Sequence, residues 1–228
     1  MDLKLEAARY ALDFIQDGMR LGLGSGSTTA YFINLLAEQL RSGSLKDIVG
    51  VPTSESTARE ARRSGIPLTT LSQLPEACLD LAVDGADEID PNLNLIKGLG
   101  RALLREKILE IHAQKFIVIA DESKLVPRLG RGPLPVEIAQ FEADLQVRWL
   151  TSLGCRAELW REENGSPVVT DNANYLVRCW FPDGIENPYQ LARTLADRPG
   201  IVEHGLFLGM ASLAIVATNR GIKILEKK

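Results

Sequence analysis

The chain has 228 residues, of which 45% are hydrophobic and 25% are charged, a composition typical of a globular enzyme with one large or two modest domains. Its formal net charge of −4 at pH 7 excludes the broadly basic surface by which many proteins bind nucleic acids. The three cysteines are scattered and only two histidines are present, so the sequence predicts neither a disulfide framework nor a histidine-based metal site.

No apolar run approaches the ~20 residues that a membrane-spanning helix requires. The first residues also lack the apolar core of a signal peptide. We therefore expect a cytoplasmic protein that does not bind membranes.

Helical and strand-like segments alternate along the first half of the chain. In residues 3–16, for example, apolar side chains recur at spacings of three and four, which is typical of a helix with one buried face. The expected helices are residues 3–16, 30–40, 53–64 including the cap, and 102–112. The expected strands are residues 19–23, 48–52, 65–71, 79–83 and 115–120. Such alternation predicts an α/β domain, Rossmann-like and doubly wound around a mostly parallel sheet.

A loop rich in glycine and hydroxyl groups, Gly22–Thr29, joins the first strand to the second helix. The free N–H groups and the dipole of a helix N-terminus favour an anion, and Ser25, Ser27 and Thr28 add hydroxyl donors on either side of Gly26. The glycine spacing does not fit a dinucleotide-binding fold, and the Gly-Lys-Ser/Thr sequence of a Walker loop is missing. The loop therefore predicts a site for a small phosphate, although a helix capped by hydroxyls explains the same residues.

Two carboxylates, Asp84 and Asp87, follow the buried strand 79–83 and are separated by Gly85 and Ala86. Ligands of α/β proteins bind at the carboxyl ends of the strands, so we expect these side chains to face a ligand crevice. Neighbouring carboxylates repel each other when both are ionised, so one tends to keep its proton near neutral pH. The pair thus predicts a proton donor and a proton acceptor in one place. The alternative is that each is only a turn residue or a helix cap.

Further along the same stretch, Lys97 supplies a positive charge, and Gly98 and Gly100 let the backbone approach a ligand closely. Glu106 lies one or two turns into the following helix and can act as a general base. Arg101 is expected on that helix, either steadying the acidic loop or lying in solvent. A phosphate loop, paired acids, a lysine and a base fit proton transfer next to a carbonyl, without a metal or a redox cofactor. From spacing alone, the expected substrate is a small phosphorylated carbonyl compound.

The second half of the chain changes character after Lys124, where residues 126–135 form a connection rich in glycine and proline. The next expected elements are strand 134–138, helix 141–153, strand 156–160, strand 175–181, helix 188–197 and strand 200–202. Their order, βαββαβ, is that of a ferredoxin-like unit. The three tryptophans of this region suggest core, cover or a subunit interface and not catalysis. They are Trp149, Trp160 and Trp180.

These elements predict two domains. Residues 1–130 and 205–228 are expected to form the α/β catalytic domain, to which strand 211–217 returns. Residues 131–204 are expected to form a smaller α+β domain that serves as an interface or a lid.

Several motifs of this sequence resemble ribose-5-phosphate isomerase, type A. The family's Val-Asp-Gly-Ala-Asp-Glu motif corresponds to Val83–Glu88, its Lys-Gly-Gly-Gly motif to Lys97–Gly100, and its Arg-Glu-Lys motif to Arg105–Lys107. Its Gly-Ser/Thr-Gly-Ser-Thr loop is matched by Ser25–Thr28, and its Ala-Asp-x-Ser-Lys motif by Ala120–Lys124. The resemblance covers nearly the whole chain. It departs from the family at Leu99, where glycine is usual. A positive φ at this position would be strained for leucine, whereas any other φ would mean that Leu99 only adds a side chain.

The resemblance implies an aldose–ketose isomerase that interconverts D-ribose 5-phosphate and D-ribulose 5-phosphate, in the non-oxidative branch of the pentose phosphate pathway. It implies enediolate chemistry without metal or cofactor, and a homodimer or homotetramer. The implied substrate-binding residues are Ser25, Gly26, Ser27, Thr28, Asp84, Gly85, Ala86, Asp87, Lys97, Gly98, Leu99, Gly100 and Lys124.

The implied catalytic residues have distinct roles. Glu106 removes the proton at C2 and returns it at C1, Asp84 or Asp87 helps to open the sugar ring, and Lys97 stabilises the enediolate. Lys4 or Lys124 helps to hold the phosphate, although a surface position explains either lysine.

Two other functions stay open from the sequence. A sugar-phosphate sensor on the same fold would bind without turnover, which Leu99 favours and the presence of Glu106 with both aspartates disfavours. A nicotinamide-dependent dehydrogenase is disfavoured by the glycine spacing.

Overall fold

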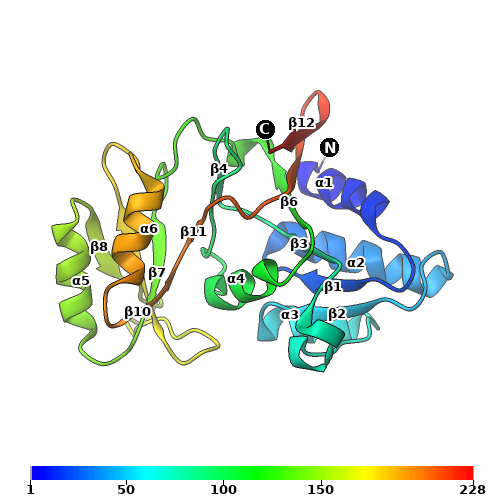
Figure 1. Cartoon of the computed structure of the whole chain (residues 1–228), viewed down its shortest axis with the longest axis horizontal. Helices are drawn as coiled ribbons and strands as arrows, with labels where there is room; N and C mark the ends of the chain where they lie inside the picture. Colours follow the sequence, from blue (N-terminus) through cyan, green and yellow to red (C-terminus); the bar gives the residue numbers. More distant parts are fainter. Residues whose placement is uncertain (1, 228) are drawn as a thin grey trace. The chain divides into compact units, whose positions relative to one another are not determined.

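The computed structural model describes residues 2–227, which form two compact units (Figure 1). The first unit consists of the described residues of Met1–Ala86, Arg105–Lys124 and Met210–Lys228. The second consists of Asp87–Leu104 and Leu125–Gly209. This division differs from the boundaries expected at residues 130 and 205, chiefly because residues 87–104 belong to the second unit. Asp87, Lys97 and the turn at residues 98–101 therefore belong to a different unit from the strand that ends at Asp84.

The first unit is built on a six-stranded sheet in the order β13-β12-β6-β3-β1-β2. Its strands are β1 (Arg20–Leu23), β2 (Val49–Pro52), β3 (Leu81–Asp84), β6 (Phe116–Asp121), β12 (Leu213–Thr218) and β13 (Gly221–Glu226). All neighbouring pairs are parallel except β12 with β13. The predicted Rossmann-like α/β fold with a mostly parallel sheet is thus confirmed. The edge strand β13 was not predicted, and most of its residues are exposed.

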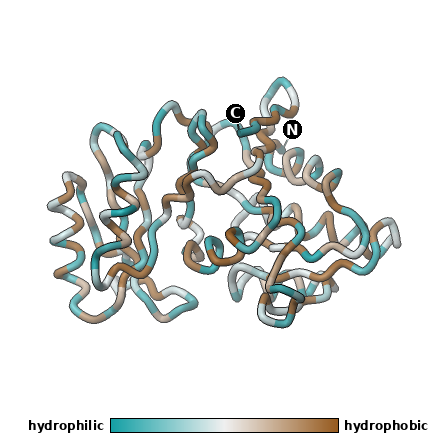
Figure 2. Tube along the Cα trace, viewed as in Figure 1, coloured by the Kyte–Doolittle hydropathy of each residue, from teal (hydrophilic) through white to brown (hydrophobic). Residues whose placement is uncertain are grey.

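Among the described residues, the first unit contains the α-helices α1 (Leu3–Ala11), α2 (Ser27–Ser42) and α3 (Glu55–Arg63), together with α4 (Leu103–Ile111) from Arg105 onward. Alternate strand side chains, such as Leu21, Leu23 and Val83, join the core that contains the apolar faces of α1 and α2. The tubes of β6 and β12 are accordingly mainly brown in Figure 2. A smaller apolar cluster contains Val51 of β2, Leu79, and Leu109 of α4. The sheet therefore carries helices on both faces.

Two expected elements differ in the structure. Residues 65–71 form no strand and contribute only an isolated parallel bridge between Gly50 and Leu68, because Pro67 lacks the N–H group that a ladder needs. Helix α2 begins at Ser27, three residues before its expected start, because Gly26 supplies the N-cap with a φ of +100°.

The second unit contains a four-stranded antiparallel sheet in the order β10-β7-β9-β8. Its elements are β7 (Leu134–Ile138), α5 (Ala143–Ser152), β8 (Arg156–Leu159), β9 (Tyr175–Trp180), α6 (Pro188–Ala196) and β10 (Ile201–His204). This confirms the predicted ferredoxin-like order. Apolar side chains of both helices pack with those of the sheet in one core, which contains Val136, Val177, Leu150 and Leu195.

A small three-stranded sheet also belongs to the second unit. Its order is β11-β5-β4, with β4 (Glu88–Ile89), β5 (Leu95–Ile96) and β11 (Leu206–Phe207) paired antiparallel. Strands of two residues carry no readable periodicity, so the sequence did not predict them.

Within residues 2–227, no helix combines the length and the apolar character that crossing a membrane requires.

Candidate functional site

The hydroxyl loop leaves β1 at the carboxyl edge of the first unit's sheet. The N–H group of Gly24 donates to the carbonyl of Val83 at 3.0 Å. A Cβ added at Gly24 would lie 2.1 Å from the carboxylate of Asp84, so the backbone passes where no side chain fits. Glycine therefore brings the start of the loop directly against Asp84.

Asp84 ends β3 and is almost fully buried, with 1% of its surface exposed. Its Oδ1 accepts from the N–H of Ser25 at 3.0 Å, the N–H of Gly85 at 2.6 Å and the hydroxyl of Thr29 at 3.3 Å. Hydrogen bonds to a carboxylate are stronger than those between neutral groups. The acid predicted to face the crevice thus also fixes the hydroxyl loop to the sheet.

The hydroxyl groups of the loop have different surroundings. The Oγ atom of Ser25 lies 2.8 Å from Thr53 Oγ1, 3.0 Å from Ser54 Oγ and 3.2 Å from Thr57 Oγ1, so it belongs to a network at the start of α3. Ser27 instead accepts a hydrogen bond from Nζ of Lys4 at 2.9 Å. The Ser27 hydroxyl and the Lys4 ammonium group therefore lie together at the N-terminus of α2.

Lys124 lies at the same edge of the sheet, in the short 3-10 helix that follows β6. Its positive charge lowers the pKa of the Asp121 carboxyl group. Burial alone raises the pKa of Asp121, but the hydrogen bonds from Ser123 and the charges of Lys124 and Lys4 together lower it below its ordinary value. Both lysines are thus near Asp121, and the first unit gathers two positive charges near the hydroxyl loop.

Glu106 is the fourth residue of α4 and is buried, with 3% of its surface exposed. The preceding residue, Arg105, donates to Oε1 of Glu55 at 3.0 Å, which ties α4 to the first residue of α3. The predicted base therefore lies on a helix that this ion pair joins to α3.

The second unit holds the predicted residues Asp87, Lys97, Gly98, Leu99 and Gly100. Asp87 donates its N–H to the carbonyl of Ile96 at 2.8 Å, and its Oδ2 accepts from the N–H of Leu99 at 2.9 Å. The donors that hold this carboxylate thus differ from those that hold Asp84.

Lys97 follows β5 and is buried, with 3% of its surface exposed. Its N–H donates to the carbonyl of Gly205 at 2.9 Å, and its Nζ lies 5.4 Å from the centre of the Phe207 ring. The next residue, Gly98, has a φ of +111°, and an added Cβ would lie 2.8 Å from the Leu103 side chain. Glycine is therefore required at the start of this turn.

Leu99 does not have a positive φ, so its side chain is simply added to the turn without backbone strain. The strained residue is Arg101, with a φ of +69°. The expectation that Arg101 lies on the following helix is wrong, since the N–H of Arg101 donates to the carbonyl of Gly98 at 2.9 Å and α4 begins at Leu103. Arg101 closes the glycine turn instead.

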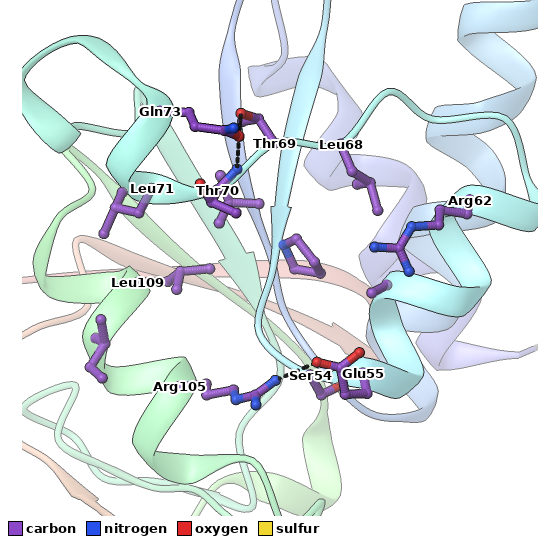
Figure 3. A pocket seen from close by; sticks show the side chains of 14 residues that line it. Ser54, Glu55, Arg62, Leu68, Thr69, Thr70, Leu71, Gln73, Arg105 and Leu109 are labelled. Carbon is purple, nitrogen blue, oxygen red and sulfur yellow. Dashed lines mark hydrogen bonds and ion pairs between the residues drawn. The ribbon is translucent and has the colours of Figure 1, made fainter. Parts of the chain in front are cut away.

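A cavity of about 400 Å³ lies in the first unit between α3, α4 and residues 68–73 (Figure 3). Arg62, Gln73 and the Arg105–Glu55 ion pair lie around it. The described residues that line it include none of those predicted to bind substrate. The sequence did not reveal this cavity because its walls come from separate segments of the chain.

In the described part of the chain, no three or more histidine, cysteine, aspartate or glutamate residues are grouped so that they could hold a metal ion.

Comparisons with known proteins agree on one family. The model of ribose 5-phosphate isomerase A (phosphoriboisomerase A) matches residues 49–221. A ribose-5-phosphate isomerase A of Roseiflexus castenholzii is 52% identical over 221 residues, which are 96% of this chain and 93% of that relative.

Solved structures give the same result. A D-ribose-5-phosphate isomerase in complex with phospho-erythronic acid is 46% identical, with a TM-score of 0.95, over 99% of this chain and 98% of that one. The ribose 5-phosphate isomerase A of Methanocaldococcus jannaschii is 38% identical, with a TM-score of 0.93, over 99% of each chain.

Proposed function

The chain belongs to the ribose 5-phosphate isomerase A family, and we propose that it interconverts D-ribose 5-phosphate and D-ribulose 5-phosphate. The observation that carries this proposal is the match over nearly the whole chain to enzymes of that name. The described residues support it with an anion-binding loop and buried acid and base groups. A similar protein binds phospho-erythronic acid, which agrees with a phosphorylated sugar as the ligand.

The phosphate is proposed to bind at the N-terminus of α2. The N–H groups of Gly26, Ser27 and Thr28 precede or begin the helix, where an anion is favoured by the helix dipole. Lys4 donates to the Ser27 hydroxyl, and the charges of Lys4 and Lys124 both lower the pKa of Asp121 at the same edge of the sheet. A dianionic phosphate would therefore meet donors and positive charge together.

Proton transfer is proposed to use Glu106 as the general base. The carboxylate takes the proton from C2 of the open-chain aldose, and the electron pair of the C–H bond forms the enediolate while the carbonyl oxygen O1 becomes the oxyanion. Transfer of the O2 proton to O1, for which Asp84 or Asp87 can serve, and return of the first proton to C1 give the ketose. One of these aspartates also helps to open the ring.

The developing negative charge on oxygen needs a fixed positive group. Lys97 supplies one, since it is buried and its backbone is held by Gly205. Preorganised charge of this kind is worth most in the transition state, where the oxyanion forms. The N–H groups near Gly98 and Gly100 add donors on the same turn.

A cytoplasmic location and a homodimer or homotetramer complete the proposal. The scattered cysteines support a reducing compartment, and the family resemblance supports an oligomer. Light scattering coupled to size-exclusion chromatography would distinguish a dimer or tetramer from a monomer.

The decisive experiment compares the native protein with Glu106→Gln in EDTA, with ribose 5-phosphate as substrate. We expect turnover by the native protein and a loss of kcat of at least ~100-fold in the variant, because the amide cannot accept the C2 proton. Exchange of solvent deuterium into the sugar should fall in parallel. Glu110→Gln is the matched control, since Glu110 is buried one turn further along the same helix, and we expect it to keep most of the activity.

Each contrary outcome has a clear meaning. Full activity of Glu106→Gln would assign the base to another residue. Binding of ribose 5-phosphate by the native protein without isomerisation would overturn the enzyme and favour a sugar-phosphate sensor.

A further inference from the structure

We propose that Arg101 is a positioning residue for the isomerase reaction, which it serves by anchoring the Gly98–Arg101 turn to Glu162 and Trp160. This inference rests on the proposed function, because it gives the turn that follows Lys97 a role in catalysis. Arg101 itself touches no reacting atom in this proposal.

The backbone of Arg101 is the first sign of a special role. Its φ of +69° lies in the left-handed region, which residues with a Cβ avoid and glycine adopts freely. Its N–H closes the turn by donating to the carbonyl of Gly98 at 2.9 Å. Backbone strain of this kind persists where the surrounding contacts impose it, and such places are often functional. The side chain of Arg101 supplies these contacts.

The guanidinium group of Arg101 makes a two-pronged ion pair with Glu162. Nη1 lies 2.6 Å from Oε1 and Nη2 lies 3.1 Å from Oε2, which is the geometry that suits arginine and a carboxylate. The same guanidinium stacks over the Trp160 ring, 5.2 Å from its centre. Lysine could not reproduce this planar arrangement. The contact is therefore specific to arginine.

The partners of Arg101 are fixed to the second unit's four-stranded sheet. The backbone N–H of Trp160 donates to the carbonyl of Leu176 at 2.7 Å, and the backbone carbonyl of Trp160 accepts from the N–H of Val168 at 2.9 Å. Glu162 donates its N–H to Ser166 at 2.8 Å. The hairpin that begins at Trp160 is thus continuous with the hydrogen bonding of β9. It gives Arg101 an anchor that does not depend on the turn itself.

The turn is thereby held at both ends. Before the turn, the N–H of Lys97 is bound to the carbonyl of Gly205. At its end, Arg101 is bound to the hairpin, and between these points the Leu99 N–H holds the carboxylate of Asp87 at 2.9 Å. Loss of the Arg101 anchor would leave Lys97 attached but would loosen the donors that follow it. Misplacement of catalytic groups by about 1 Å can cost up to ~100-fold in rate.

The kinetic test compares Arg101→Gly and Glu162→Gln with the native protein. Glycine suits a φ of +69°, so Arg101→Gly removes the side chain without adding backbone strain. We expect Arg101→Gly to lose about tenfold in kcat with KM within about twofold, and Glu162→Gln to lose less, because the contact of Arg101 with Trp160 remains. The double variant should lose no more than Arg101→Gly, since Glu162 acts through Arg101. The control is Arg161→Ala, whose side chain caps the neighbouring Gly165 carbonyl on the same hairpin. It should retain native kcat.

Charge exchange separates positioning from simple loss of structure. Arg101→Glu alone should be the least active variant, and adding Glu162→Arg should recover at least about threefold in kcat. Native kcat in Arg101→Gly, or independent losses that multiply in the double variant, would overturn the proposal.

Hydrogen exchange keeps this inference separate from the proposed function. In Arg101→Gly, we expect the Leu99 amide to exchange at least about tenfold faster than in the native protein, while Arg161→Ala leaves it unchanged. If the native protein does not isomerise ribose 5-phosphate, the proposed function fails, and the exchange rate still decides whether Arg101 anchors the turn. An unchanged rate would overturn the anchor itself.

Discussion

At the scale of single residues, Gly24 and Asp84 form one structural unit. The loop backbone occupies the space beside the carboxylate, and Asp84 Oδ1 in turn accepts from the N–H of Ser25. A larger residue at Gly24 would push the loop away from the acid, because the nearest atoms belong to a buried side chain held in place by several donors. The position of the phosphate loop and that of the acid are therefore coupled.

Gly24→Ala tests this coupling. The added Cβ would lie 2.1 Å from the Asp84 carboxylate, so we expect the free energy of unfolding to fall by about 1–3 kcal/mol, as for other overpacked sites. We also expect kcat/KM for ribose 5-phosphate to fall at least ~10-fold. Urea denaturation measures the free energy of unfolding, and initial rates measure kcat/KM.

Gly100→Ala is the control for stability, because a Cβ there meets no atom within 4 Å and the residue has no positive φ. We expect its free energy of unfolding to stay within about 0.5 kcal/mol of native. Equal stability of native protein and Gly24→Ala would contradict the close approach.

At the scale of elements, an ion pair ties the starts of two neighbouring parallel strands. Asp80 precedes β3 and accepts from the backbone N–H of Arg20 at 2.7 Å, from its Nε at 2.9 Å and from its Nη2 at 2.6 Å. The side-chain hydrogen bond from Arg20 is the main cause that lowers the pKa of Asp80, and it outweighs the effect of burial. This contact fixes the amino ends of β1 and β3, whose carboxyl ends carry the hydroxyl loop and Asp84.

The lowered pKa predicts a pH dependence of stability. A carboxyl group whose pKa is lower in the folded state stabilises the protein above its unfolded pKa of about 3.9, and this contribution is lost as the pH falls through the folded pKa. Asp80→Asn should therefore reduce the free energy of unfolding by about 1 kcal/mol at pH 6, a value limited by partial exposure. Urea titrations at pH 6 and at pH 3 should show the difference shrink at the lower pH. A difference that grows on acidification would reject this account.

At the scale of the whole molecule, each unit is assembled from segments far apart in the chain. In the second unit, Glu88 on β4 joins two such segments. Its buried carboxylate accepts from the N–H of Gly130 at 2.7 Å and of Gly132 at 2.5 Å. The early segment that carries Asp87 and Lys97 is thereby bound to the connection that leads into β7.

Glu88→Gln should weaken this junction. An amide can offer only one oxygen to the two N–H groups, so we expect the free energy of unfolding to fall by about 2 kcal/mol, the usual range for hydrogen bonds to a charged group. Chemical denaturation monitored by tryptophan fluorescence measures it, since Trp149, Trp160 and Trp180 all lie in the second unit. Glu163→Gln, at an exposed position, serves as the control. A Glu88→Gln variant as stable as this control would show that the junction does not depend on the charge.

Local patterns in the sequence were enough to predict the fold class, the ferredoxin-like order and the family. These follow from local patterns: the alternation of apolar runs with helical periodicity, and motifs such as Val83–Glu88 that are contiguous in the chain. The roles of Glu106 and Lys97 stay predictions, since they concern chemistry and not folding.

The contacts that join distant positions could not be predicted in this way, because they depend on how the folded chain packs. Arg101 and Glu162 are 61 positions apart in the chain, and no local pattern pairs them, because the pairing depends on how a turn and a hairpin pack. The same holds for the two-residue strands β4, β5 and β11, which are too short for periodicity and exist only as partners of one another. The sequence predicts Arg101 on the helix because it lies one turn before Arg105, whereas the closed turn at Gly98 sets its left-handed backbone.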